Sequence, residues 1–163
     1  MPRDPRTDDR MAKLLRRLEA AWADLEASYT GLSNAQLMQP GVAGDWSVRD
    51  ILAHVTTWEE EALKYLPWIL EGRRPPRYVS YGGIDAFNEL RTEQKRRLSL
   101  SEVRRQLDET HQRLIDFVST VPADQLGSET RFRRRLRLDT YGHYLEHAEM
   151  VRRWRNDTPR WEC

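Results

Sequence analysis

Cysteine is almost absent from this chain of 163 residues, because its one cysteine is the last residue, Cys163. A framework of internal disulfide bonds is therefore excluded. No apolar run approaches the length that crosses a membrane, and the first ten residues lack the apolar segment of a secretory signal. We therefore expect a soluble, cytoplasmic protein that has no membrane partner.

Alternating strand patterns and internal repeats are also missing. Glycine and proline, eight of each, fall mostly between segments in which apolar residues recur every three or four positions. Charged residues make up 33% of the chain and hydrophobic residues 39%, a balance typical of amphipathic helices with charged outer faces. We expect a single all-α domain over residues 1–163, with flexible termini at residues 1–8 and 156–163.

The apolar periodicity predicts four main helices and one short helix. The first begins at Asp8 or Asp9 and stops at Gly31, and the short helix covers about residues 85–97. The second main helix begins at Ser47, and Pro67 should kink it or end it near residue 65 or 66, with a further turn allowed to residue 70. The third main helix covers about residues 101–121 and the last about residues 138–155, and a polar connection at 123–138 joins them. This pattern predicts a four-helix bundle with an additional short helix.

Two of the four histidines, His143 and His147, lie one helical turn apart in the last predicted helix. At about 100° per residue they are about 40° apart around the helix and share a face with Met150 and Trp154. Glu146 lies on a different, acidic edge. An exposed position for the two imidazoles is therefore less favoured than a position facing the bundle.

A third histidine, His54, lies at the margin of the apolar face of the second predicted helix, about 40° from Trp58 and close to the carboxylate of Glu61. Three imidazoles from two helices suit one divalent transition metal, such as zinc, nickel, copper or iron. Three protein ligands leave positions open, and such an ion can activate water near neutral pH. We therefore predict a metal site at His54, His143 and His147.

The same residues also allow plainer interpretations. The histidines can be buried polar residues of the core, and the zincin signature is absent because Tyr144 follows His143. Trp58, Tyr144 and Trp154 are candidate substrate-binding residues, although core packing explains each of them as well. Glu61 is a candidate fourth ligand or general base.

Five arginines crowd into residues 131–137, at positions 131, 133, 134, 135 and 137. The formal net charge of the chain is only +1, and no aromatic stacking platform accompanies them. We expect a solvated loop and no specific nucleic-acid binding, with an anionic substrate or a thiol cofactor as the alternative. His111 has no histidine partner and is expected to be structural or exposed.

Two stretches, "GDWSVRDILAHVTTWE" and, about ninety residues later, "GHYLEHAEMVRRW", resemble the DinB-like superfamily of metalloenzymes. The stretch "IDAFNEL", which contains Asn88, is similar to the ClbS/DfsB-type branch, although Asn88 is equally compatible with an exposed helix position. The resemblance implies a four-helix bundle with His54, His143 and His147 as metal ligands. The superfamily includes thiol-dependent transferases and isomerases and damage-inducible proteins, and the branch is associated with self-protection against a DNA-damaging toxin.

Our leading hypothesis is therefore a metal-dependent hydrolase or small-molecule or thiol transferase that acts in detoxification or stress protection. A protein that sequesters a small toxic molecule or a metal without catalysis is the alternative, and a purely structural bundle is the third. We expect a small-molecule substrate as the partner. A homodimer is compatible with the bundle, but no heptad seam is long enough to support it.

Overall fold

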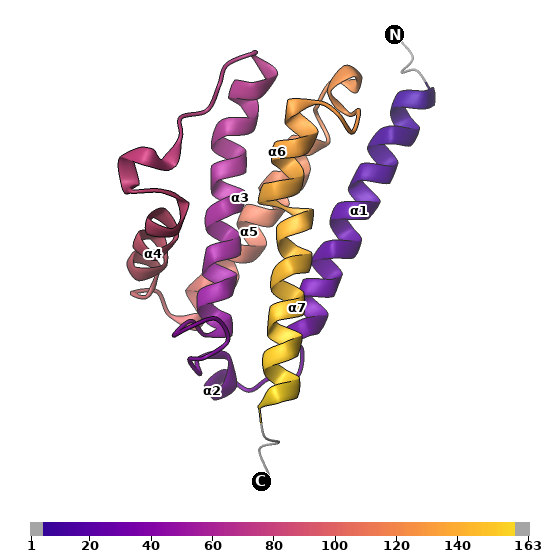
Figure 1. Ribbon diagram of the computed structural model, residues 1–163. Coiled ribbons are helices and arrows are strands. Elements are labelled where there is room, and N and C mark those ends of the chain that lie inside the picture. The colour runs from indigo at the N-terminus through magenta and orange to yellow at the C-terminus, as the bar shows by residue number, and fades with distance from the viewer. Residues whose placement is uncertain (1–4, 159–163) are drawn as a thin grey trace.

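The computed structural model describes residues 5–158 and places most of them in helices (Figure 1). The long helices are α1 (Pro5–Tyr29), α3 (Val48–Leu70), α5 (Leu100–Val118) and α7 (Tyr141–Asp157). The shorter ones are α2 (Asn34–Leu37), α4 (Ile84–Lys95), α6 (Arg131–Asp139) and the 3₁₀ turns η1 (Tyr78–Tyr81) and η2 (Ala123–Gln125). No β-strand forms within residues 5–158, and the prediction of an all-α fold is confirmed.

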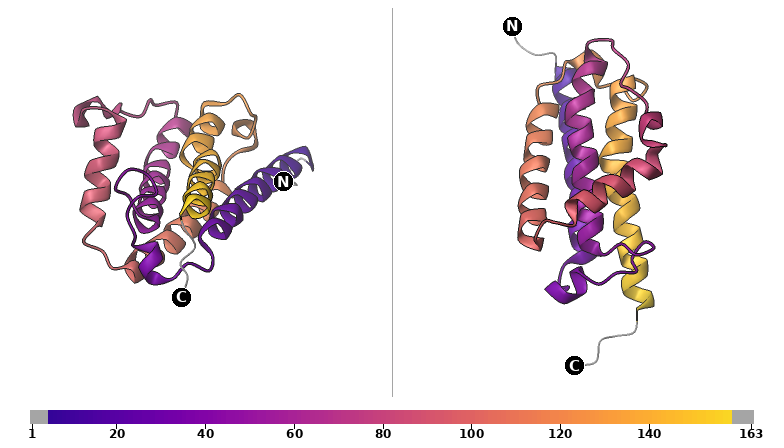
Figure 2. Two further views of the ribbon diagram at one scale, coloured as in Figure 1. Left: turned by 60° about the horizontal axis from the view of Figure 1, so that its bottom comes forward. Right: turned by 90° about the vertical axis from the view of Figure 1, so that its left-hand side faces the viewer.

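The four long helices form a bundle around one hydrophobic core. Helix α1 packs along α7, and α3 packs along α5 (Figure 1). Helix α4 lies outside the bundle against α3, whereas α6 continues into α7 along one direction (Figure 2). The predicted four-helix bundle with an additional short helix is therefore confirmed, with α4 as that helix.

The start of α3 is held by the N-terminal cap that its sequence predicts. The Ser47 side chain accepts a hydrogen bond from the Asp50 backbone N–H at 3.2 Å, and the Asp50 carboxylate accepts one from the Ser47 N–H at 3.0 Å. Such a reciprocal cap satisfies two backbone donors that the first turn leaves free. Helix α3 then continues through Pro67 to Leu70, which is the further turn that the sequence allowed.

The prediction of a polar connection at 123–138 is wrong for its second half, because residues 131–139 form helix α6. Thr130 caps this helix by accepting a hydrogen bond from the Arg133 N–H at 3.1 Å. Phe132 and Leu136 lie four residues apart on one face and are fully buried. Packing of these two side chains against the core stabilises the nine-residue helix, although most of its other residues are charged.

Helix α7 begins at Tyr141 and not near residue 138, because the backbone breaks at Thr140 (φ −130°, ψ −102°). Gly142 then passes close to α6. A Cβ atom at Gly142 would lie 2.8 Å from the backbone oxygen of Arg137. The join between α6 and α7 therefore needs a residue without a side chain, directly before His143.

The expected flexible termini can be located only in part. Residues 5–8 belong to α1, residues 156 and 157 belong to α7, and residues 1–4 and 159–163 lie outside the described residues. Cys163 is among the latter. Within residues 5–158, no helix combines the length and apolar character that crossing a membrane requires.

Candidate metal centre

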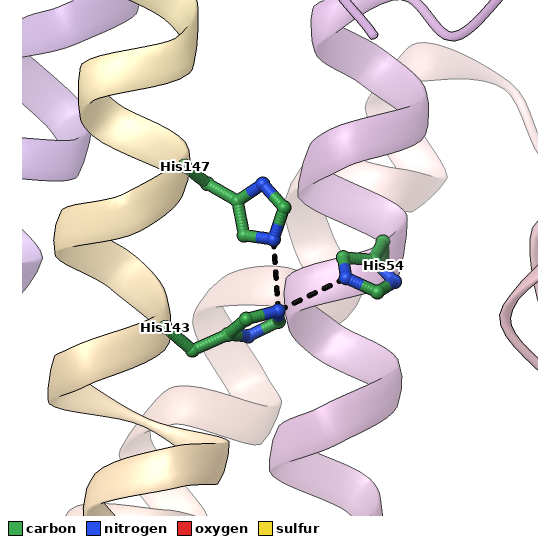
Figure 3. Close-up of side chains that lie close together, drawn as sticks. All are labelled: His54, His143 and His147. Atoms are coloured by element: carbon green, nitrogen blue, oxygen red, sulfur yellow. Dashed lines mark hydrogen bonds between the residues drawn. The ribbon is translucent and has the colours of Figure 1, made fainter. Parts of the chain in front are cut away.

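The three histidines that the sequence singles out meet between α3 and α7. His143 Nε2 lies 2.9 Å from His54 Nε2 and 2.8 Å from His147 Nε2 (Figure 3). Their potential ligand atoms all lie within 4.8 Å of one another. Because an α-helix rotates by about 100° per residue, His143 and His147 lie on the same face of α7. His54 on α3 lies opposite them.

Burial keeps all three imidazoles in the neutral form. Burial is the main reason that the pKa of His54 is lowered to about 3, that of His143 to about 2 and that of His147 to about 4. Charge repulsion makes a smaller contribution to the lowered pKa values of His54, from His147 and Lys95, and of His143, from the other two histidines. Neutral imidazole is the form that binds transition metals, so the cluster has the correct protonation state at neutral pH.

The donor set fits a divalent metal ion. A neutral imidazole carries one N–H, so His143 Nε2 can donate to only one of its two histidine neighbours. The Nδ1 atoms of His143 and His147 are buried and have no hydrogen-bond partner in the described part of the chain. Nitrogen ligands of one tetrahedral zinc ion lie about 3.3 Å apart, so small ring movements would suffice to share an ion.

A cavity of about 460 Å³ opens beside the histidines, between α3, the η1–α4 segment and the α6–α7 pair. We call it the histidine cavity. Its walls combine apolar and aromatic side chains with a few polar ones: Ala43, Trp46, His54, Trp58, Tyr78, Ile84, Asn88, Arg135, Leu138, Asp139, His143, Glu146, His147 and Met150. Its volume and its apolar walls suit a small organic molecule.

The polar residues in the cavity wall are held by specific partners. Arg135 Nε donates to the Asp139 carboxylate at 2.6 Å, and Arg135 Nη2 donates to the Tyr78 hydroxyl at 2.9 Å. Burial outweighs the attraction of Arg135 and raises the pKa of Asp139 to about 6. These three residues come from η1 and α6, and no sequence spacing relates them to the histidines.

The other candidate site residues have different places. Trp58 lines the histidine cavity, whereas Trp154 lines a second cavity near the end of α7. Tyr144 is fully buried in the core and does not line the histidine cavity. Glu61 accepts a hydrogen bond from the Tyr78 hydroxyl at 2.9 Å and is not one of the three grouped ligands.

A second polar cluster joins Glu59, His111 and Tyr144 inside the bundle. His111 Nδ1 lies 3.1 Å from Glu59 Oε2 and 3.4 Å from the Tyr144 hydroxyl. The His111 ring stacks on Trp22, with 3.6 Å between the ring centroids. Of the two expectations for His111, the structural one holds, because this residue joins α5 to α1, α3 and α7.

Arginines from two separate segments meet at one end of the bundle. Arg131 Nη2 donates to the backbone oxygen of Arg73 at 3.2 Å, which brings the segment after α3 against α6. We use the name arginine surface for the exposed arginines of these two segments: Arg73, Arg74, Arg77, Arg131, Arg134 and Arg137. The sequence shows the second group as a run, but it does not show that the first group lies beside it.

Comparison with known proteins places this geometry in a family context. The model of the DinB superfamily matches residues 17–151 of the chain. No curated protein matches it.

Three solved structures share the fold. The colibactin self-resistance protein ClbS, solved in complex with double-stranded DNA, has a TM-score of 0.74 at 13% identity, with 91% of this chain and 96% of that chain covered. DfsB, a sibling lethal factor precursor, has a TM-score of 0.72 at 16% identity over 90% and 95%. An uncharacterised protein from Escherichia coli UTI89 has a TM-score of 0.71 at 15% identity over 90% and 93%.

The expectation of no specific nucleic-acid binding is wrong. A protein of the same fold, ClbS, is solved in complex with double-stranded DNA. The expectation depended on a net charge of +1 and on a solvated arginine loop. Net charge averages over the whole molecule, whereas the arginines at 131–137 lie on an ordered helix beside a second arginine segment.

Proposed function

The chain belongs to the DinB superfamily, and from this premise we propose that it is a metal-dependent protein that acts on a small molecule in the histidine cavity. One observation carries the proposal: the Nε2 atoms of His54, His143 and His147 converge as neutral donors beside a largely apolar cavity. A divalent metal ion supplies Lewis-acid catalysis when bound to such donors.

Each part of the site has a role in this proposal. The three histidines hold the ion, and Trp46, Trp58 and Met150 exclude water from a molecule bound next to it. We propose hydrolysis or transfer to a thiol as the reaction, in detoxification or stress protection. The self-resistance role of ClbS, a protein of the same fold, supports that setting.

The reaction can be tested by mass spectrometry on protein purified without a histidine tag and loaded with zinc or nickel. We expect epoxides, enones or activated esters to be converted, either to products that gain water or to adducts of a low-molecular-weight thiol. His143→Ala should slow conversion at least tenfold, since loss of one ligand weakens the metal site. Equal rates in the wild type, in H143A and in metal-free protein would contradict the proposal.

Sequestration without catalysis is distinguished in the same experiment. It predicts that an electrophile stays bound to the protein in a ratio near one to one and is recovered unchanged. If the bound electrophile contacts the metal, His143→Ala should weaken its binding. The rate of conversion should stay at the uncatalysed level in every sample.

A second candidate function, DNA binding, is favoured by the arginine surface. We propose that Arg131, Arg134 and Arg137 contact the phosphate backbone of double-stranded DNA, as the chemistry of guanidinium groups allows. ClbS, which shares the fold, is solved with such DNA. Because α6 also contributes Arg135 and Asp139 to the histidine cavity, DNA on α6 would lie near the cavity.

Fluorescence anisotropy with a labelled DNA duplex tests this second function. Arg134→Glu with Arg137→Glu should weaken binding at least tenfold at low salt, because the change reverses two charges on the surface. Arg105→Glu with Arg113→Glu is the matched control, since both arginines are exposed on α5. Equal effects of the two double variants would show that only net charge matters.

A further inference from the structure

The orientation of one amide in the histidine cavity is fixed by its neighbour. Trp58 Nε1 lies 2.9 Å from Asn88 Oδ1. An indole nitrogen can only donate, so the Asn88 atom that faces it must be the oxygen. The Asn88 amide nitrogen makes no hydrogen bond to any of residues 5–158, and Asn88 lines the cavity. Asn88 therefore offers two N–H donors to a bound molecule.

The charges of the cavity wall nearly cancel. Arg135 and Asp139 form an ion pair at 2.6 Å, and Asp139 is ionised at neutral pH because its pKa is about 6. Glu146 adds one further carboxylate at the wall. The protein's own groups thus give no excess positive charge that would select an anion.

Apolar groups also surround the entrance. Ile84 and Leu138 line the cavity and are 53% and 65% exposed. With Trp46, Trp58 and Met150 they provide apolar contact along most of a bound molecule. Transfer of apolar surface from water into such a cavity favours a molecule with few charged groups.

From these three observations we infer that the histidine cavity selects neutral, largely apolar molecules that carry a carbonyl oxygen, and that Asn88 donates a hydrogen bond to this oxygen. The inference rests on the proposed function, because it names the substrate class of the same cavity. It makes Asn88 a specificity residue, whose amide is held in this orientation by the hydrogen bond from Trp58. In the metal-free protein, an anionic molecule is correspondingly disfavoured.

Three fluorinated probes of similar shape test the inference by ¹⁹F NMR titration: 4-fluorobenzamide, 4-fluorobenzoate and 1-ethyl-4-fluorobenzene. The full chain is used in metal-free form, so that attraction of a metal for the carboxylate does not enter. We expect 4-fluorobenzamide to bind most tightly. Asn88→Asp keeps the acceptor for Trp58 but removes the donors, and Asn88→Leu removes both. Each should weaken 4-fluorobenzamide roughly fivefold, the range of one hydrogen bond.

Glu89→Gln, on the exposed side of α4, is the control and should leave the affinity of 4-fluorobenzamide unchanged. Thermal melting confirms the fold of each variant. The inference is overturned if 4-fluorobenzoate binds as tightly as the amide, if both Asn88 variants bind the amide like the wild type, or if no probe binds. Zinc binding is measured on separate samples, so a failure of the metal site is seen independently of these results.

Discussion

At the scale of single residues, Glu59 ties three long helices together. It lies on α3 with no exposed surface, and its carboxylate is 3.1 Å from His111 on α5. The Tyr144 hydroxyl on α7 lies 3.4 Å from the same imidazole nitrogen. Burial raises the pKa of Glu59, while His111 and Tyr144 hold it down by hydrogen bonding.

Replacement of Glu59 should therefore destabilise the bundle. We expect Glu59→Leu to lower the free energy of unfolding by about 2 kcal/mol, because His111 and Tyr144 lose a buried partner. Glu59→Gln keeps a side-chain oxygen at the same place and should cost less. Urea denaturation measures both, and a leucine variant as stable as the wild type would contradict this account of the cluster.

The Asp139 carboxyl should make stability depend on pH. Burial raises its pKa from 3.8 to about 6 in the folded protein, against the attraction of Arg135. The folded state then binds this proton more tightly than the unfolded state. Its stabilising contribution is complete below about pH 4 and is lost as the pH rises through 6. The change corresponds to about 3 kcal/mol.

Comparison with Asp139→Asn isolates this contribution. The difference in unfolding free energy between the wild type and D139N should fall by up to about 3 kcal/mol between pH 4 and pH 7. Urea denaturation at several pH values measures it. A difference that grows with pH would show that the ion pair with Arg135 dominates instead.

The sequence indicates that the three histidines face the inside of the bundle, because helical geometry gives the face on which each of them lies. His143 and His147 share a face through their spacing, and the capped start of α3 sets the angle of His54. The rest of the cavity follows no such rule. Tyr78, Asn88 and Arg135 come from separate elements, and only the packing of these elements against α3 and α7 brings them together.

At the scale of elements, α6 shows where periodicity is a weak guide. Five of its nine residues are arginines at exposed or partly buried positions, and only Phe132 and Leu136 are buried apolar residues. Two apolar residues four positions apart are too few to distinguish a short helix from a loop. The long helices α1, α3 and α5 could be predicted because each repeats its apolar face over several turns.

The join between α6 and α7 should not tolerate a side chain at Gly142. Alanine favours helix by about 1 kcal/mol over glycine. Its Cβ atom would, however, lie 2.8 Å from the Arg137 backbone oxygen, which cannot move without a shift of α6. We expect Gly142→Ala to lower the free energy of unfolding by about 1–2 kcal/mol and to weaken zinc binding at the adjacent His143.

Gly127→Ala is the matched control for this change. Its new methyl group would meet the Thr130 side chain at 3.8 Å, an ordinary contact. Zinc binding and stability should both stay near the wild-type values. A Gly142→Ala variant with unchanged stability and unchanged zinc affinity would mean that the close approach of α6 does not constrain the site.

At the scale of the whole molecule, the fold and the family are those that the sequence predicts, whereas the net charge led to a wrong expectation about nucleic-acid binding. The bundle and the DinB superfamily both follow from patterns spread along the chain. The net charge of +1 does not show that two segments with exposed arginines lie side by side, as the hydrogen bond between Arg131 and Arg73 places them. Charge is distributed in three dimensions, and a sum over the sequence cannot show where it concentrates.

The central claim is that His54, His143 and His147 bind one divalent metal ion. Equilibrium dialysis of tag-free protein against zinc, followed by elemental analysis, tests it most directly. The fourth histidine offers the control, because His111→Gln removes an imidazole outside the site. We predict about one zinc ion per chain in the wild type and in H111Q, and at least tenfold weaker binding when any of the three is alanine. Equal zinc in the wild type and in the triple alanine variant would contradict the claim.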